Sequence, residues 1–387
     1  MHSPFDLFIF LAVIIVQWRL TRRFLATAKA RLSPSAARKA IWAAAAFNGL
    51  MLAAFALSFS FLISRFHLPS NATQIAGGVA QIWFFASTAG YVAYAAFHFL
   101  TRQVRRRSFS PARRQLLNAT GGALLAAPFA FVGYGTFVER LHFAVREVVI
   151  PIANLPVALD GLRLLHLSDI HLSAFLSEQD LARVIDASNE LHPHLALVTG
   201  DLITAFGDPL DTCLRQVARL RADAGILGCM GNHEHYALAE TYAQREGARL
   251  GVRFLRDAAT PLRFGDGVLN VAGVDYQRSG QPYLPGAERL VLPGACNLLL
   301  SHNPDVFPVA LQKGYDVMLA GHTHGGQVTV EIFNQSINPA RFVTPYVYGL
   351  YSQDSALAFV TRGIGTIGIP TRIGAPPEIA LLHLRKA

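Results

Sequence analysis

The stretch LRLLHLSDIHLS, residues 162–173, decides the fold of the C-terminal half of the chain. In it a run of apolar residues leads directly to the polar residues Asp169 and His171. The same pattern returns in four later runs: HLALVTGD (194–201), GILGCMGN (225–232), CNLLLSHN (296–303) and YDVMLAGH (315–322). Because the apolar character of each run is continuous rather than alternating, the runs predict strands that are covered on both faces. Polar residues at the ends of such strands are typical of a functional site.

Stretches with helical spacing of apolar residues separate the early runs, at 178–191, 209–221 and 237–250. The order β-α-β-α-β predicts an α/β fold. The later strand-like runs follow one another without long helices between them: VRFL (252–255), PLRF (261–264), VLNVAGV (268–274), QVTVEIF (327–333), ALAFVTRG (356–363) and EIALLHL (378–384). We therefore expect a mixed core of two sheets with outer helices rather than a single parallel sheet.

The composition divides the chain into two unlike parts. Hydrophobic residues make up 52% of the 387 residues and charged residues only 15%, against roughly 25% charged residues in a soluble domain. Residues 1–150 carry 16 Lys and Arg against 3 Asp and Glu, whereas the remainder carries 18 against 22. The positive charges of the first part lie in short clusters between long apolar runs, which favours a membrane surface as partner and argues against nucleic acid.

We predict a membrane region at residues 1–140, a linker at 141–159 and one further domain at 160–387. A helix that crosses a bilayer needs about 20 apolar residues. Four runs are candidates: 5–18, 41–63, 75–100 and 116–138. The first is short and carries Asp6, while the fourth contains Pro128 and is rich in Gly and Ala, so a soluble helix is the alternative for that run.

The basic residues between these runs predict the orientation, because Lys and Arg are retained on the cytoplasmic side. Seven lie in residues 19–39, one in 64–74 and six in 101–114. This alternation places the N-terminus outside, both basic loops inside and the C-terminal domain on the outer face. If the fourth run does not span, the C-terminal domain stays in the cytoplasm.

The segment Arg113-Arg114-Gln115-Leu116-Leu117 bears on the same question. It resembles a twin-arginine export signal, which carries a folded, metal-loaded domain outward. The alternative is a pair of stop-transfer charges in a loop that is already rich in arginine.

Seven residues at the predicted strand ends are candidate metal ligands. They are Asp169, His171, Asp201, Asn232, His302, His322 and His324. Imidazole, carboxylate and amide donors without a thiolate suit divalent Mn, Fe, Zn or Co. Seven ligands exceed what one ion uses together with water, so we expect two ions with one bridging carboxylate. Two neighbouring metal ions activate a water molecule and screen a phosphate group during in-line displacement.

The spacing and neighbours of these residues suggest how the chain presents them. We expect Asp169 and His171 to lie in an extended exit loop, where residues i and i+2 point to the same side, and His322 and His324 to do the same. Glycine precedes Asp201, Asn232 and His322 in the sequence. Glycine allows a sharp turn and a close approach of backbone to a metal or substrate.

The series DxH, GD, GNHE, H and GHTH resembles the calcineurin-like metallophosphoesterase superfamily over residues 160 to about 385. The forms SHNPD (301–305), GHTHGGQ (321–327) and TRGIGTIGIPTRIGAPPEI (361–379) are similar to a bacterial membrane-associated branch, in which transmembrane helices or a twin-arginine signal precede this domain. The resemblance implies an αββα two-sheet sandwich, preceded here by an α-helical transmembrane region. It also implies a dinuclear metal site at the strand ends.

The resemblance also implies roles for individual residues. Asp169, His171 and His324 would hold the first metal, and Asp201 would bridge. Asn232, His302 and His322 would hold the second metal, and Asn232 would also touch a phosphate oxygen. His233 would protonate the leaving group or stabilise the transition state, as a histidine with a pKa near neutrality can. Family members often carry a second Asp where this chain has Thr204, which puts only a partner of a ligand in doubt.

Other polar residues are expected to be structural. These are His166, His192, His194, His235 and Glu234, together with the solvated charges of the loop Arg278–Tyr283 and of Arg341.

The function that these features indicate is a membrane-anchored phosphohydrolase with two divalent metal ions, a phosphodiesterase in which a metal-bridging hydroxide attacks phosphorus in line. Its expected partners are the bilayer and a phosphoester substrate that is lipid-linked, and its expected place is the bacterial inner membrane as a multi-pass protein. One alternative is a pyrophosphatase of the UDP-2,3-diacylglucosamine type in lipid A metabolism, which needs a cytoplasmic site. Another is a non-catalytic metal-binding receptor or scaffold.

Overall fold

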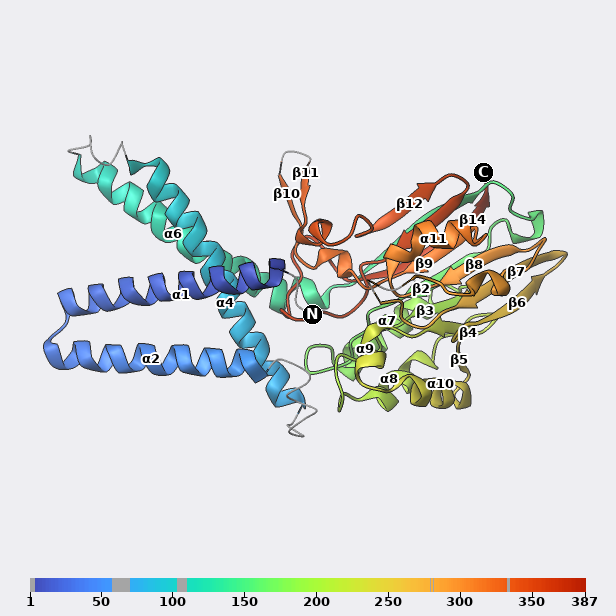
Figure 1. Cartoon of the computed structure of the whole chain (residues 1–387), viewed down its shortest axis with the longest axis horizontal. Helices are drawn as coiled ribbons and strands as arrows, with labels where there is room; N and C mark the ends of the chain where they lie inside the picture. The colour runs from blue at the N-terminus through green and yellow to red at the C-terminus, as the bar shows by residue number, and fades with distance from the viewer. Residues whose placement is uncertain (1–3, 58–69, 103–109, 279, 281, 333–334) are drawn as a thin grey trace. The chain divides into compact units, whose positions relative to one another are not determined.

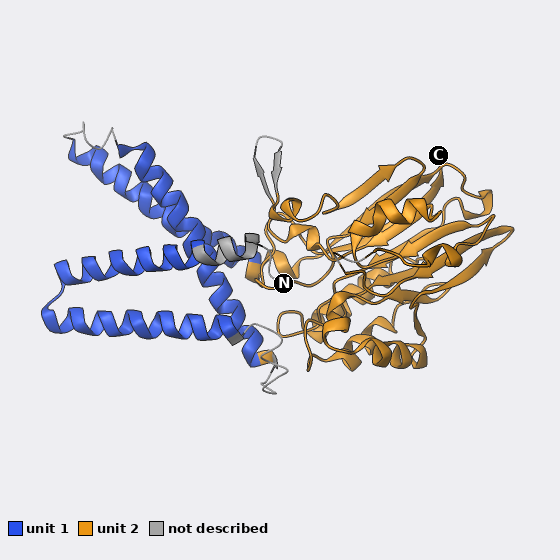
Figure 2. Ribbon diagram, viewed as in Figure 1, with its two compact units in different colours: residues 1–68, 72–135 blue, residues 69–71, 136–387 orange. Residues whose placement is uncertain are grey.

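A computed structural model describes residues 4–57, 70–102, 110–278, 280, 282–332 and 335–387 of the chain (Figure 1). The chain forms two compact units (Figure 2). The first comprises residues 1–68 and 72–135, and the second comprises residues 69–71 and 136–387. The predicted linker at 141–159 belongs to the second unit and contains its first strand, so this segment is part of the folded domain rather than a connection to it.

The first unit consists of long helices. They are α1 (Pro4–Arg31), α2 (Pro34–Leu57), α4 (Ser70–Leu100) and α6 (Pro111–Phe137). Within the described residues, three segments are long and apolar enough to cross a membrane: Pro34–Ala56, Asn71–Leu100 and Pro111–Leu141. The fourth apolar run of the sequence, despite Pro128, therefore lies in such a helix. Residues 58–63 of the second run lie outside the described part of the chain.

The basic segment 19–39 is not the loop that the sequence suggested. Helix α1 continues through its arginines to Arg31, and α2 begins at Pro34, so only a short turn separates the two helices. Arg113 and Arg114 likewise lie in the first turn of α6, and residues 103–109 of the second basic segment are not described. The predicted orientation is unaffected, because the positive-inside rule counts Lys and Arg near the ends of a span whether or not those residues are helical.

Polar side chains connect the helices of the first unit. The amide of Gln17 in α1 donates to the Ser87 hydroxyl of α4 over 2.7 Å and accepts from the Trp83 indole over 3.2 Å. Gln17 and Ser87 are both buried. Hydrogen bonds between polar side chains of neighbouring apolar helices help to fix how the helices pack against each other.

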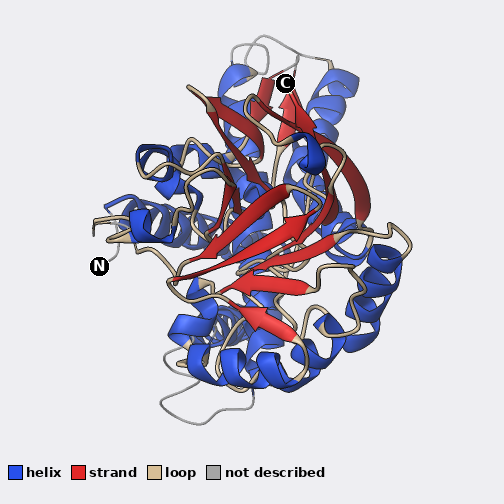
Figure 3. Cartoon of the chain, turned by 90° about the vertical axis from the view of Figure 1, so that its right-hand side faces the viewer, coloured by secondary structure: helices blue, strands red, loops and turns tan. Residues whose placement is uncertain are grey.

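The second unit contains two six-stranded sheets that are each mixed (Figure 3). The strands of the first sheet are β1 (Ala144–Ile152), β2 (Arg163–Leu167), β3 (Leu195–Thr199), β4 (Ile226–Cys229), β5 (Val252–Phe254) and β14 (Glu378–Lys386). Their order in space is β1-β14-β2-β3-β4-β5. Strands β2 to β5 are parallel, and β14 runs antiparallel to β2 and parallel to β1.

The second sheet has the order β12-β13-β9-β8-β7-β6. Its strands are β6 (Ala258–Phe264), β7 (Gly267–Gly273), β8 (Cys296–Leu300), β9 (Val317–Ala320), β12 (Gly349–Gln353) and β13 (Ala356–Val360). The four inner strands are parallel, and both edge strands are antiparallel to their neighbours. A separate hairpin joins β10 (Val330–Ile332) and β11 (Gln335–Ile337).

The two sheets pack face to face, and helices cover their outer faces. One buried cluster joins residues of both sheets, among them Leu164, Leu197, Leu298 and Phe359. The outer face of the first sheet packs against α7 (Glu178–Asn189), α8 (Leu210–Val217) and α10 (Glu240–Arg249). The outer face of the second packs against α11 (Phe307–Gln312). This is the αββα sandwich that the resemblance implied, and every inner strand is covered on both faces as the apolar runs predicted.

Candidate metal centre

The seven candidate ligands lie where parallel strands of both sheets end. Asp169 and His171 follow β2, Asp201 follows β3, and Asn232 begins α9 (Asn232–Tyr236) after β4. In the second sheet His302 follows β8, and the pair His322 and His324 follows β9. Six of the seven form two groups in which the ligand atoms all lie within 4.8 Å of one another: Asp169, His171, Asp201 and His324, and Asp201, His302 and His322.

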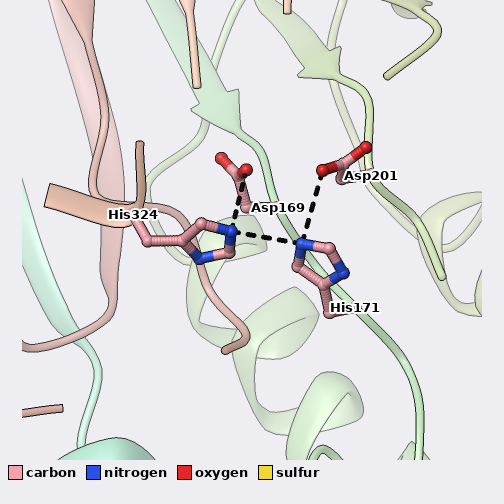
Figure 4. A group of neighbouring side chains, drawn as sticks. All are labelled: Asp169, His171, Asp201 and His324. Atoms are coloured by element: carbon pink, nitrogen blue, oxygen red, sulfur yellow. Dashed lines mark hydrogen bonds and ion pairs between the residues drawn. The ribbon is translucent and has the colours of Figure 1, made fainter. Parts of the chain in front are cut away.

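The four side chains of the first group point toward one another (Figure 4). The His171 Nε2 atom lies 3.2 Å from the His324 Nε2 atom and 3.4 Å from the Asp201 Oδ2 atom. The His324 Nε2 atom lies 3.4 Å from the Asp169 Oδ1 atom. All four side chains are buried.

The second group shares Asp201 with the first. The His302 Nε2 atom lies 3.0 Å from the Asp201 Oδ2 atom and 3.2 Å from the His322 Nδ1 atom. The seventh candidate, Asn232, is buried, and its Oδ1 atom has no hydrogen-bond partner within the described structure. A buried amide oxygen without a partner carries a desolvation cost, which coordination of a cation would remove.

The spacing of these atoms fits divalent cations. Two ligand atoms that are each about 2.1 Å from one ion lie roughly 3.0–3.4 Å apart in octahedral or tetrahedral coordination. The five separations given above, from 3.0 to 3.4 Å, fall in this range, and the remaining pairs within each group lie within 4.8 Å. Nitrogen and oxygen donors without a thiolate complete the fit to a divalent metal of intermediate hardness.

Electrostatics gives a second reason for a cation in this cluster. Burial raises the pKa of Asp169. Burial also opposes ionisation of Asp201, but the neighbouring His302 and His233 outweigh it and hold the pKa of Asp201 well below its usual range. Burial disfavours charge on His302 as well, yet Asp201 and Asp169 outweigh that effect and raise the pKa of His302 to about 10. A protonated imidazole thus balances the buried carboxylates, a role that a divalent cation fills with more charge.

The backbone around the ligands is left-handed rather than extended, which corrects the prediction for Asp169-Ile-His171 and His322-Thr-His324. The φ angles are 51° at Asp169, 48° at His171, 54° at Asp201, 74° at His322 and 53° at His324. Residues other than glycine rarely adopt this conformation, and such strain concentrates at functional sites. The chain therefore brings these side chains together by tight turns at the strand ends and not by strand alternation.

Two of the preceding glycines are required by close packing. A Cβ atom on Gly231 would lie 2.1 Å from the Asp201 Oδ1 atom, and one on Gly321 would lie 2.2 Å from the Asp169 Oδ2 atom. Both distances are far below van der Waals contact. The close approach that the sequence suggested thus takes place between the glycine backbone and the ligand carboxylates.

Backbone carbonyl groups fix which nitrogen of a histidine faces the cluster. The His302 Nδ1 atom donates to the Thr199 carbonyl over 2.6 Å, which leaves Nε2 toward Asp201. The His171 Nδ1 atom lies 3.1 Å from the Ile203 carbonyl and 3.2 Å from the Thr204 hydroxyl. Such partners orient metal-binding imidazoles. Thr204 thus contacts a ligand at the position where the sequence left that contact in doubt.

Glu234 holds the loops that carry Asp201 and Asn232. Its buried carboxylate accepts backbone N–H groups from Gly231 over 2.9 Å, Asp201 over 2.9 Å and Leu202 over 2.7 Å. A longer contact of 3.4 Å reaches the Ile203 N–H group. The side chain acts on the positions of the ligands rather than on a substrate, in line with the structural role that we expected.

His233 lies beside the first group of ligands. Its ring is 4.7 Å from that of His171 between centroids, and its Nδ1 atom donates to the Thr204 carbonyl, which leaves Nε2 free of that bond. Burial lowers the pKa of His233 to about 4. The imidazole is therefore neutral at pH 7 in this structure. The role that the family resemblance implies calls for a pKa closer to neutrality.

The other histidines that were set aside make contacts outside the two ligand groups. The His166 Nε2 atom lies 2.8 Å from the Thr199 hydroxyl, and the His194 Nδ1 atom accepts the Arg163 N–H group over 2.9 Å. His235 pairs with Glu240 over 2.8 Å at the surface. The His192 carbonyl accepts from the Arg163 side chain.

The two arginines set aside, Arg278 and Arg341, are exposed. Residues 279 and 281 of the loop that contains Arg278 lie outside the described part of the chain.

Two features of the site had no signal in local spacing. Arg372 is fully buried and donates to the carbonyl groups of His324, Ala375 and Gly365, which fixes the ligand turn after β9. Tyr276 places its ring 5.8 Å from that of His322. Arg372 lies within the quoted segment 361–379, so its place in that motif was the one signal that could have found it.

Comparison with known proteins agrees with this geometry. The family model of the calcineurin-like phosphoesterases matches residues 162–326. The metallophosphoesterase YkuE of Bacillus subtilis is 30% identical over 70% of this chain and 97% of its own length. The phosphodiesterase YaeI of Escherichia coli is 29% identical over 57% of this chain and 82% of its own. A transmembrane protein with a metallophosphoesterase domain from Danio rerio is 32% identical over 62% of this chain and 57% of its own.

The chain therefore belongs to the calcineurin-like phosphoesterase family. It is a metal-dependent phosphoester hydrolase whose Asp and His cluster forms the divalent metal site. Its apolar helices, together with transmembrane relatives, associate it with a membrane.

Proposed function

We propose that the chain is a membrane-anchored phosphodiesterase that uses two divalent metal ions. Asp201 carries this proposal, because its carboxylate belongs to both groups of ligands. A carboxylate shared between two sets of ligands is the arrangement of two-metal hydrolases. Mn, Fe, Zn and Co all suit the donor set.

The ligands divide between the two ions as the family resemblance implies. Asp169, His171 and His324 would hold the first ion, and Asp201 would be shared between the two ions. The second ion would be held by Asn232, His302 and His322. Bound ions supply Lewis acidity, which lowers the pKa of a coordinated water and screens the negative charge of the phosphate. The unpartnered Oδ1 atom of Asn232 would be its metal ligand, and the N–H donors of the same amide group would be available to a phosphate oxygen.

His233 supplies the proton to the leaving group. Its Nδ1 atom is fixed on the Thr204 carbonyl, so Nε2 is the atom that carries and donates the catalytic proton. A bound phosphodiester brings negative charge beside the ring, and negative charge raises the pKa of an imidazole. In hydrolysis the water oxygen bonds to phosphorus and the bond from phosphorus to the leaving oxygen breaks. The leaving oxygen takes a proton from the Nε2 atom of protonated His233, and the proton that the attacking water gives up returns to that atom.

The membrane association favours a lipid-linked phosphoester as substrate and the bilayer as partner, with no role for nucleic acid. Seven basic residues lie in 19–39 and six in 101–114, against one in 64–74. This alternation favours a multi-pass protein of the bacterial inner membrane with the catalytic domain on the outer face. Two C-terminal reporters test the orientation, one active only outside and one only inside. A signal from the inner reporter alone would contradict this orientation and make a cytoplasmic nucleotide-linked lipid the next substrate to assay.

The experiment that tests the two-metal phosphodiesterase uses the full chain in lipid nanodiscs. Metal content is measured by mass spectrometry, and hydrolysis of bis-p-nitrophenyl phosphate and p-nitrophenyl phosphate is followed with Mn, Fe, Zn or Co added after removal of metal by a chelator. We expect two ions per chain, activity that returns only with metal, and a higher kcat/KM for the diester.

The variants Asp201→Asn and Asp354→Asn make a matched pair for this experiment. Both aspartates have a left-handed backbone, with φ angles of 54° and 50°, but Asp354 is exposed in the turn between β12 and β13. That turn lies at the end of β13 opposite to the ligands. We expect Asp201→Asn to lose both ions and the activity, and Asp354→Asn to keep both. One ion per chain, or loss of only one ion in Asp201→Asn, would overturn the shared-carboxylate arrangement.

A further inference from the structure

Three large apolar side chains lie exposed in the two loops that flank the metal centre. Phe206 belongs to the loop after Asp201, and Tyr236 and Leu238 belong to the end of α9 and the turn that follows it. Their exposed fractions are 58%, 54% and 85%. We call these three residues the apolar rim. Burial of such side chains away from water is favourable, so their exposure beside a catalytic site calls for a partner.

The loop of Phe206 is attached directly to the site. The Thr204 carbonyl accepts from the Nδ1 atom of His233, and the Thr204 hydroxyl lies 3.2 Å from the Nδ1 atom of His171. The Asp208 carboxylate accepts two backbone N–H groups of the same loop over 3.0 and 2.8 Å. These bonds close a tight turn over residues 204–208, with Phe206 in its middle.

A row of rings connects Tyr236 with the ligands. Its ring lies 5.8 Å from that of His233 and 6.5 Å from that of Tyr276, between centroids. The Tyr276 ring in turn lies 5.8 Å from that of His322 and 6.3 Å from that of His302. Tyrosine rings thus connect the second group of ligands with the exposed Tyr236, and their faces offer apolar contact area beside the site.

Leu238 combines exposure with an unfavourable backbone. Its φ angle is 55°, a conformation that leucine rarely adopts because of its Cβ atom. The other leucine with positive φ, Leu284 at 53°, is fully buried, so its packing offsets the strain. The Leu238 side chain lies in solvent instead. Strain at an exposed apolar residue next to an active site indicates a functional constraint rather than a folding one.

We propose that the apolar rim receives the hydrocarbon part of a membrane lipid whose phosphodiester bond is hydrolysed at the metal centre, an inference that rests on the proposed function. Water supplies the oxygen that bonds to phosphorus, the bond from phosphorus to one ester oxygen breaks, and that oxygen takes a proton. The products are an alcohol and a phosphomonoester, one of which keeps the hydrocarbon.

The sequence and the chain connection favour a lipid over an apolar peptide as the occupant. The rim segments LITAFG (202–207) and YALA (236–239) contain no charged residue. Residues 138–143 alone connect α6, which is apolar enough to cross a membrane, with β1 of the catalytic unit. A site tethered this closely to a bilayer meets lipids at high effective concentration.

The test uses soluble diesters that differ only in hydrocarbon length, from methyl to octyl p-nitrophenyl phosphate, with the metal-loaded full chain in nanodiscs. Each fully buried methylene contributes about a fourfold gain in affinity. Since the rim covers only part of a chain, we expect kcat/KM for the octyl ester to exceed that for the methyl ester by at least about tenfold.

Leu238→Asn is the decisive variant, because asparagine tolerates positive φ and the fold should be kept or slightly stabilised. We expect this change and Phe206→Ser to lower the octyl-to-methyl ratio at least threefold. The matched control is Val157→Ser: Val157 is 75% exposed in the short helix Val157–Leu159, which precedes β2 and so lies at the end of that strand opposite to the ligands. We expect the control to keep the wild-type ratio, even if the octyl ester partitions into the nanodisc.

A second measurement separates this proposal from the proposed function. The affinities for octyl phosphate and methyl phosphate are compared by titration calorimetry, which needs no turnover. A chain that hydrolyses the methyl ester without any preference for length, or a Leu238→Asn variant with the wild-type ratio, overturns the apolar rim and leaves the phosphodiesterase in place. A chain that is inactive with every metal, but binds octyl phosphate more tightly in a manner that Leu238→Asn abolishes, overturns the phosphodiesterase and supports the rim.

Discussion

Replacement of Glu234 by glutamine should destabilise the catalytic unit although it changes one atom. The carboxylate accepts three backbone N–H groups over 2.7 to 2.9 Å and a fourth over 3.4 Å. In Glu234→Gln one of the two oxygens becomes an NH2 group, which faces two of these donors and accepts from neither. Two hydrogen bonds to a charged group amount to about 3–6 kcal/mol.

One effect opposes this loss. Burial, followed by the negative charge of Asp201, raises the pKa of Glu234, so its charge is itself unfavourable in the folded state. Removal of that charge offsets part of the lost hydrogen bonding, and we expect a net loss of about 2–4 kcal/mol. For a unit of this size, that corresponds to a fall of roughly 5–15 °C in the midpoint of thermal unfolding.

The assay is thermal unfolding of the full chain in nanodiscs, with and without added metal, monitored by far-ultraviolet circular dichroism. Glu246→Gln is the matched control, because Glu246 accepts from Arg249 at the surface of α10 and makes no contact with the ligand loops. The control should unfold at the wild-type temperature. A Glu234→Gln variant that also unfolds within 1–2 °C of the wild type, by the same conversion, would refute the idea that this carboxylate holds the loops of Asp201 and Asn232.

Three further outcomes follow from the site. His233→Ala should lower kcat by about 10²- to 10⁴-fold while metal content stays at the wild-type level, and loss of metal from a folded variant would contradict its role as proton donor. Arg372→Met should lower the unfolding midpoint by an amount equivalent to about 3–5 kcal/mol, because several buried carbonyl groups lose their donor. Arg372→Lys should recover only part of this stability, and an unchanged midpoint in both variants would contradict the role of Arg372 as the donor to these carbonyl groups. Burial lowers the pKa of His166 to about 3. Between pH 6.5 and 3 this imidazole is therefore protonated in the unfolded chain but neutral in the folded chain. The stability that this residue contributes is complete above pH 6.5 and falls by about 1.4 kcal/mol per unit as the pH drops toward 3. Because the buried His233 contributes a slope of the same sign, His166→Gln should reduce the slope of the unfolding midpoint between pH 6 and 4.5 without removing it, and an unchanged slope would exclude a contribution from His166.

The strands that the sequence predicts best are those in the middle of the sheets. Strands β3 and β8 are buried along their whole length, and all of their residues except Asn297 are apolar or small, so each run is easy to recognise. Strands β1 and β12 lie at sheet edges, and many of their side chains are exposed. The sequence of β1, AVREVVIPI, contains Arg146, Glu147 and Pro151, and that of β12, GLYSQ, is short and half polar. The sequence pattern therefore predicts a linker and not a strand at residues 144–152.

The site shows the same division between local and distant information. The ligand types could be recognised because each follows an apolar run, and the fold brings six of the seven candidates into two close groups. The left-handed backbone at Asp169 could not be predicted, because tertiary contacts rather than propensity impose it. Arg372 and Glu234 act through residues that are distant in sequence, such as His324 and Asp201, and no local spacing encodes such contacts.

The position of β14 in the first sheet has a consequence for biosynthesis. Residues 378–386 lie between β1 and β2, although more than 200 residues of chain separate β14 from both. Until the ribosome has made this segment, β1 has no neighbour in the sheet and β2 exposes one edge of unpaired backbone groups. The first sheet therefore cannot be completed before translation reaches residue 386, and until then its unpaired edge is prone to aggregation.

Such a nascent chain would already be tethered to the membrane by the helices that precede it. We expect a cell to depend on chaperones until residue 386 is available, and the first sheet then to be completed in a late step of high contact order. Lesions in β14 should accordingly appear in the cell as aggregation or proteolysis of the whole catalytic unit, and not as a partly active enzyme.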